Sequence, residues 1–149
     1  MEQEVGSTAR YILTAVGNSV HPYYRNLPES FQYPAVYFPV PEVSTRNATF
    51  DTYFSDYILS VTFFHSSKQE AYELALTALT AIKQHRNLVP LLDSTGKQIG
   101  NRYLRLDNPK IHCTSENTAT LVIQFTTRKP YTDNRGRNVT SFYTNRYLK

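Results

Sequence analysis

The sequence of 149 residues contains no tryptophan and a single cysteine, Cys113. One cysteine cannot form a disulfide within the chain, so a disulfide-held secreted scaffold and a zinc module built on cysteine pairs are excluded. No apolar run reaches the roughly 18 residues that a transmembrane helix needs. The first four residues include Glu2 and Glu4, and no basic region or apolar stretch follows them. We therefore expect no signal peptide, and a protein that is made and kept in a cytoplasm-like compartment or in an assembly built there.

The positive charge of the chain is concentrated at its C-terminal end. The formal net charge is +4, and residues 128–149 contain six basic side chains but only one acidic one. The preceding 127 residues contain ten basic and eleven acidic side chains. Nucleic-acid-binding domains usually carry their basic residues on the folded body itself. The near-neutral body therefore disfavours such a domain.

Two segments have the pattern of helices. Residues 1–18 carry apolar side chains near helical spacing, and Gly17 near the end of this segment is the expected helix stop. Residues 68–86 have the stronger pattern, because Ser67 and Glu70 stand at capping-box spacing in front of it. The predicted apolar stripe of this second helix consists of Ala71, Leu74, Ala75, Ala78, Leu79 and Ile82.

Two segments alternate between apolar and polar residues as strands do, residues 52–64 and residues 119–125. Shorter strand candidates are found at residues 33–40, 103–106 and 110–113, and a hairpin turn at residues 93–96. Residues 20–30 are predicted to be turn and loop because of Pro22 and Pro28. Together these elements predict an α+β fold, with a mostly antiparallel sheet of about four to five strands and both helices on one face. Residues 1–129 form the predicted single domain, and residues 130–149 a C-terminal extension, or arm.

Residues able to do bond-making chemistry are few and scattered. The four histidines, which are His21, His65, His85 and His112, lack the spacing of a metal-binding helix. Cys113 follows His112 directly, so on a strand the two side chains would point to opposite faces. A small buried side chain is the better interpretation of Cys113. We therefore predict no catalytic, metal-ligating or cofactor-binding residue and no enzyme activity.

The C-terminal arm is the one segment whose composition indicates that it binds a partner. Arginine interleaved with aromatic residues can bind single-stranded nucleic acid, or can lie on a neighbouring subunit. The chain contains 12 tyrosines, and tyrosine supplies amphipathic contact area, which favours the protein interface. The predicted interface residues are Arg135, Arg137, Phe142, Tyr143, Arg146 and Tyr147.

The order of elements resembles that of the tail-terminator, or tail-completion, proteins of long-tailed bacteriophages. The shared layout is an N-terminal helix, a Tyr-Pro-Ala-Val-Tyr-Phe strand after a proline-rich loop, a long strand, an amphipathic helix and a closing strand. It covers residues 5–128, and the arm goes beyond it. The resemblance implies a structural virion protein whose copies form a hexameric ring. This ring caps the tail tube and presents a surface to the head connector.

The same resemblance defines the expected partners and location. The partners are further copies of the chain, the tail tube protein and the head-connector protein, with no membrane and no cofactor. Nucleic acid is expected only as DNA passing through the ring. The location is the tail or neck of the virion, and the host cytoplasm during assembly. Two alternatives stay open, another neck component such as a head–tail connector or head-closure protein, and a small nucleic-acid-binding module.

Overall fold

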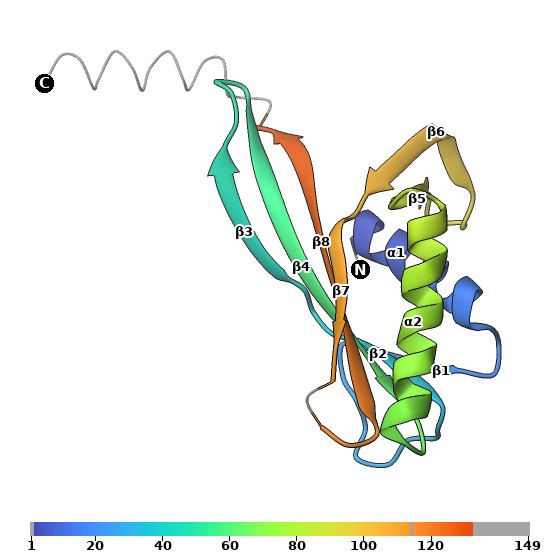
Figure 1. The fold of residues 1–149 in the computed structure, drawn as a ribbon. Helices are drawn as coiled ribbons and strands as arrows, with labels where there is room; N and C mark the ends of the chain where they lie inside the picture. The colour runs from blue at the N-terminus through green and yellow to red at the C-terminus, as the bar shows by residue number, and fades with distance from the viewer. Residues whose placement is uncertain (1, 114, 133–149) are drawn as a thin grey trace, which may run out of the picture. The chain divides into compact units, whose positions relative to one another are not determined.

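The computed structural model describes residues 2–113 and 115–132, and the chain divides into two compact units. Unit 1 consists of Met1–Glu42 and Tyr57–Phe125, and unit 2 of Val43–Asp56 and Thr126–Lys149. The described elements are, in chain order, α1 (Gln3–Val16), β1 (His21–Tyr24), β2 (Ala35–Phe38), β3 (Glu42–Asn47), β4 (Thr52–Phe64), α2 (Lys68–Gln84), β5 (Leu88–Leu92), β6 (Gln98–Arg105), β7 (Asp107–His112) and β8 (Thr118–Pro130) (Figure 1).

The α+β fold predicted from the sequence is confirmed. Within the described residues, six strands form one sheet in the order β1-β2-β4-β8-β7, with β3 paired to β4, and β5 and β6 form a second sheet. The pairs β2–β4, β5–β6 and β7–β8 are antiparallel, and β1–β2 is parallel. The strands therefore exceed the four to five that the sequence predicts.

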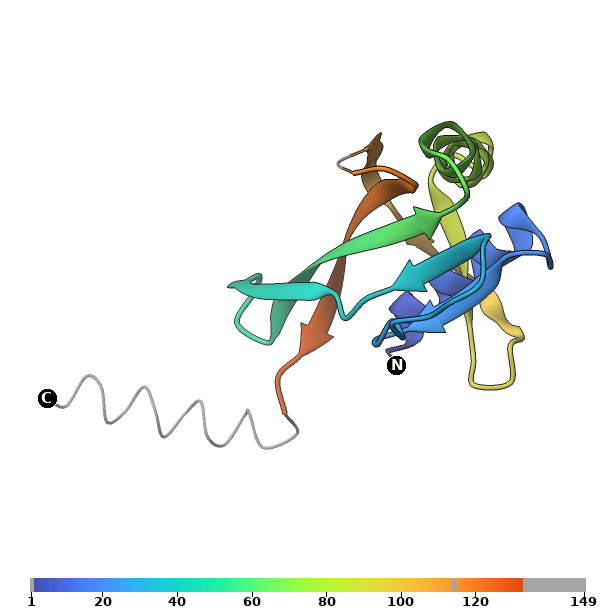
Figure 2. The ribbon, with the colours of Figure 1, turned by 90° about the horizontal axis from the view of Figure 1, so that it is seen from below.

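The core of unit 1 lies between one face of the large sheet and the two helices. In β4 the side chains of Leu59, Val61 and Phe63 are fully buried, whereas their neighbours of opposite parity are partly exposed. The α2 stripe predicted from the sequence faces this core, with Ala71, Ala75, Ala78 and Ile82 buried. α2 lies along β7 in Figure 1, and Figure 2 views α2 nearly end-on beside the sheet. Burial on a single strand face agrees with helices on one side of the sheet.

The loop prediction for residues 20–30 is wrong in part, because β1 occupies His21–Tyr24. Pro22 is tolerated there because β1 lies at the end of the sheet and has one strand partner. The Tyr24 ring stacks on Phe38 of β2, with ring centroids 5.5 Å apart. A four-residue strand that contains a proline is too short to give a periodic signal.

Pro34 and Pro39 flank β2, which is only four residues long and lies between β1 and β4. A short strand within residues 33–40 is therefore confirmed. β7 begins at Asp107 and includes Pro109, so it starts three residues before the strand predicted at residues 110–113. Cys113 follows β7 directly and is half-buried against the core, not fully buried within a strand.

The start of α2 forms as predicted. Ser67 is the N-cap residue, and its Oγ accepts a hydrogen bond from the Glu70 backbone N–H at 3.2 Å. The Glu70 carboxylate accepts hydrogen bonds from the hydroxyls of Ser66 and Ser67, and the Ser66 bond is the main cause of its lowered pKa. The helix ends at Gln84, two residues earlier than expected, because Arg86 has a positive φ of 57°.

Candidate interaction surface

The six interface residues predicted from the sequence all lie outside the described residues. They fall within residues 133–149, so their prediction stays a prediction. Three residues that the sequence assigns to the arm, Pro130, Tyr131 and Thr132, are described. Pro130 ends β8, and the Tyr131 backbone N–H donates a hydrogen bond to the Asp51 carbonyl at 3.0 Å. Tyr131 therefore belongs to the ordered hydrogen-bonded part of unit 2.

The described part of unit 2 consists of segments of three strands, with β4 between β3 and β8. β3 pairs with β4, β4 neighbours β8, and Ser55 is the sole buried residue among those described in this unit. The exposed apolar side chains include Val43 and Phe50, which are 50% and 57% exposed. Sheets of a few strands need a hydrophobic face or a packed helix for independent stability. The described residues of unit 2 therefore have no hydrophobic core of their own.

The net positive charge of the chain is located in unit 2. By residue count, unit 2 holds seven basic and three acidic side chains, whereas unit 1 holds nine of each. The whole net charge of +4 therefore falls in unit 2, including the part beyond Thr132. A cationic, poorly buried unit suits contact with an acidic or polar partner surface.

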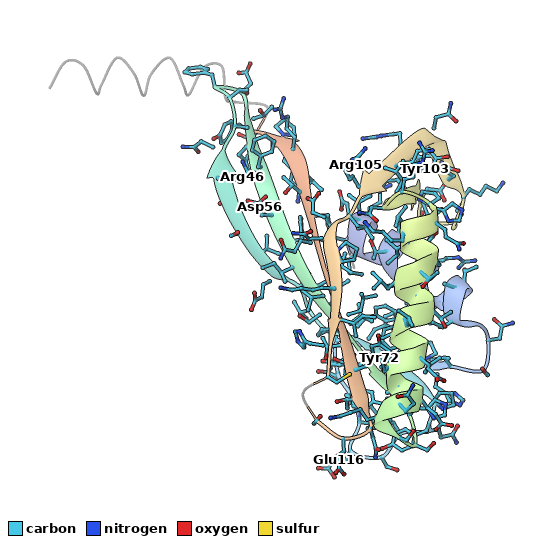
Figure 3. The ribbon with its side chains drawn as sticks, in the orientation of Figure 1. Arg46, Asp56, Tyr72, Tyr103, Arg105 and Glu116 are labelled. Atoms are coloured by element: carbon cyan, nitrogen blue, oxygen red, sulfur yellow. The ribbon has the colours of Figure 1, made fainter. Side chains whose placement is uncertain are left out.

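One face of unit 2 carries a connected polar cluster. Arg46 on β3 donates hydrogen bonds to the Asp56 carboxylate on β4, from Nε at 2.8 Å and from Nη2 at 3.3 Å. Thr126 on β8 donates its hydroxyl to the same carboxylate at 2.6 Å. Figure 3 shows Arg46 and Asp56 together between β3 and β4. The bidentate contact joins β3 to β4 and fixes the Arg46 side chain on the face of the sheet, and the Thr126 bond adds β8.

The same face places an aromatic ring between two cations. The Arg46 Cζ lies 4.3 Å from the Phe54 ring centroid, and the Arg128 Cζ lies 5.0 Å from it. Both distances are within the range of cation–π attraction. Elsewhere in unit 2, the Tyr53 and Tyr131 rings approach with centroids 5.4 Å apart, beside a hollow of about 390 Å³. Unit 2 thus presents half-exposed aromatic rings whose positions are fixed by neighbouring side chains.

The hydrogen bond from Arg46, followed by that from Thr126, holds the pKa of Asp56 below its ordinary value of 3.8. Because the pKa is lowered in the folded state, the contribution of Asp56 to stability is present above the ordinary value. It is lost as the pH falls through the folded-state pKa.

We expect Arg46→Gln to raise the pKa of Asp56 toward its ordinary value, because the strongest hydrogen-bond donor to the carboxylate is removed. An NMR titration of the Asp56 carboxyl carbon measures this shift. Arg105→Gln, an exposed arginine of unit 1, is the matched control and should leave the titration unchanged. An Asp56 pKa that is the same in both variants would contradict the contact.

Sequence reasoning missed this cluster. Arg46 lies in a segment where every residue is exposed, and no periodic pattern marks β3 as a strand. A usable signal was the pair of aromatic residues, Tyr53 and Phe54, that stand next to one another at the start of β4. Neighbours on a strand point to opposite faces, so the pair places an aromatic ring on each side of the sheet.

A second feature is a groove of about 540 Å³ in unit 1, between α1 and β1. Arg10 is the one charged side chain in its lining, so no acid–base pair converges there. No cluster of three or more histidine, cysteine, aspartate or glutamate residues in the described part of the chain can hold a metal ion. Within residues 2–113 and 115–132, every helix is too short or too polar to cross a membrane.

The α+β fold of the chain is also found in a protein of a virion. A chain in the virion of the native gene transfer agent (GTA) particle superposes with a TM-score of 0.50 and 15% identity, over 86% of this chain and 92% of that one. At this identity the likeness shows the fold alone. No protein-family model matches the chain.

Two proteins of Bacillus subtilis (strain 168) are related to the chain in sequence. The phage-like element PBSX protein XkdJ is 31% identical over 131 residues, which cover 88% of each chain. The protein YqbJ is 29% identical over 142 residues, which cover 95% of each chain. The chain belongs to the family of XkdJ.

Proposed function

We propose that the chain is a structural protein of a phage-like particle, and that it acts as a tail terminator. In this role its copies form a ring that caps the tail tube and joins it to the head connector. The observation that carries the proposal is the relationship to XkdJ, a phage-like element protein, over 88% of both chains. The fold shared with a chain of the GTA virion, and the element order of tail terminators in residues 5–128, support it.

The surface chemistry supports assembly and not catalysis as the basis of this role. Unit 2 exposes aromatic and cationic side chains on a sheet with one buried residue among those described. We propose that residues 133–149 extend this surface as an arm to the neighbouring copy, through Arg135, Arg137, Phe142, Tyr143, Arg146 and Tyr147. Arms that reach the next subunit suit a ring, because each copy then donates and receives the same contact.

The proposal is tested in particles assembled without the chain. A tube that lacks its terminator has no surface for the head connector, so electron micrographs should show tubes and heads that are not joined. Supplying the full chain should restore joined particles. Joined particles of normal appearance in the absence of the chain would contradict the tail-terminator role.

A further inference from the structure

Five described strands have a single strand partner and therefore form sheet edges, namely β1, β3, β5, β6 and β7. Three of these edges contain a proline, Pro22 in β1, Pro90 in β5 and Pro109 in β7. Proline has no N–H to donate, and its presence blocks the addition of a further strand. β3 and β6 contain neither proline nor lysine, so they are the two described edges without this protection.

The β3 edge is exposed along its whole length. All six residues from Glu42 to Asn47 are exposed, and Val43 is an apolar side chain among them. The hydrogen bond to Asp56 holds Arg46 on the face of the sheet, so the charge of Arg46 does not prevent a further strand from pairing with the edge of β3. Glu42 forms no ion pair with the described residues. The free charge on β3 is therefore negative.

The β6 edge has complementary properties. Six of its eight residues are exposed, and Tyr103 is a large aromatic side chain that is 51% exposed. Arg102 and Arg105 form no ion pair with the described part of the chain. Figure 3 shows Tyr103 and Arg105 on this strand. The free charge on β6 is therefore positive.

We propose that β3 of one copy pairs with β6 of the next copy, so that the two sheets become continuous across the subunit boundary. The pairing places Glu42 opposite the arginines of β6, and it places Val43 on the strand next to Tyr103. A pair of opposite charges and a pair of apolar and aromatic side chains are both favourable across neighbouring strands. It also adds a fourth strand to the three described strands of unit 2, which bury little surface among themselves. The contact joins two different surfaces of the chain, as a closed ring requires. This inference rests on the proposed ring.

The test is thiol cross-linking between two single-cysteine versions of the full chain. Cys113→Ser is the background, since Cys113 is the one native cysteine. Val43→Cys and Tyr103→Cys are introduced in separate chains, which are co-expressed with tags of different mass and treated with a short bifunctional thiol reagent. Adjacent strands lie about 4.8 Å apart, which such a reagent spans. We expect a cross-linked heterodimer of the two versions as the main product, and none from Tyr103→Cys alone.

The matched control pair is Val40→Cys with Tyr72→Cys, which are 68% and 38% exposed and lie outside both edges. This pair should give no heterodimer. Dimers from Val43→Cys alone would mean that β3 pairs with β3, and would overturn the inference. Light scattering on the same samples separates the two proposals. An oligomer without the Val43–Tyr103 product overturns the strand pairing only, whereas a monomer overturns the ring as well.

Discussion

A chain that ends at Thr132 is expected to associate only weakly, whereas the full chain is expected to be a stable oligomer. The truncation removes residues 133–149, which contain all six proposed arm residues, and keeps Tyr131 with its contacts in unit 2. Buried aromatic and arginine side chains carry much of the binding energy at protein interfaces. Size-exclusion chromatography with light scattering measures the change. An unchanged oligomer size would reject the arm.

Charge reversal in the arm refines this expectation. Arg135→Glu with Arg137→Glu should weaken assembly while the melting temperature of the monomer barely changes, because these residues are proposed to contact a neighbour. Lys97→Glu with Lys110→Glu is the control, since it makes the same change in net charge at exposed positions of unit 1. A large loss of melting temperature in the arm variant would mean that the two arginines belong to the fold.

Phe125→Ala is expected to lower the free energy of unfolding by about 3–5 kcal/mol, as truncation of a buried aromatic side chain does. Phe125 is 1% exposed, and its ring stacks on Tyr57 with centroids 4.8 Å apart and planes 13° from parallel. The stacked pair joins β8 to β4 within the core of unit 1. Alanine would leave a cavity that the surrounding strands cannot fill.

Urea denaturation measures this loss. Tyr72→Ala is the control, because Tyr72 is 38% exposed, lies outside the proposed contact between copies, and such surface changes usually stay within about 0.5 kcal/mol. Equal loss of stability in the two variants would contradict the described core, since burial would then not determine the cost of removing an aromatic ring.

The sequence predicts best where one periodic pattern is long enough to dominate. β4 has the predicted bounds of residues 52–64, and α2 begins directly after the predicted cap, Ser67. Both elements face a common core, so their apolar spacing follows from burial. β1 and β3 were missed, because their residues are mostly exposed and their positions depend on pairing with distant strands.

The surface features of the protein could also be predicted from the sequence only in part. The concentration of charge toward the C-terminal end is visible in the sequence, and it corresponds to unit 2. The cluster of Arg46, Asp56 and Thr126 was not visible, because its members come from three separate strands. The role of His85 was not visible either: its Nδ1 lies 2.6 Å from the Tyr11 hydroxyl, so it links the end of α2 to α1.

Negative-stain electron microscopy of the purified full-length chain tests the account most directly. If copies join through unit 2 and the arm, the images will contain closed rings of uniform size with a central opening, and their diameter will match that of a tail tube. Separate particles with the mass of one 149-residue chain, at concentrations where phage-like particles assemble, would contradict the account.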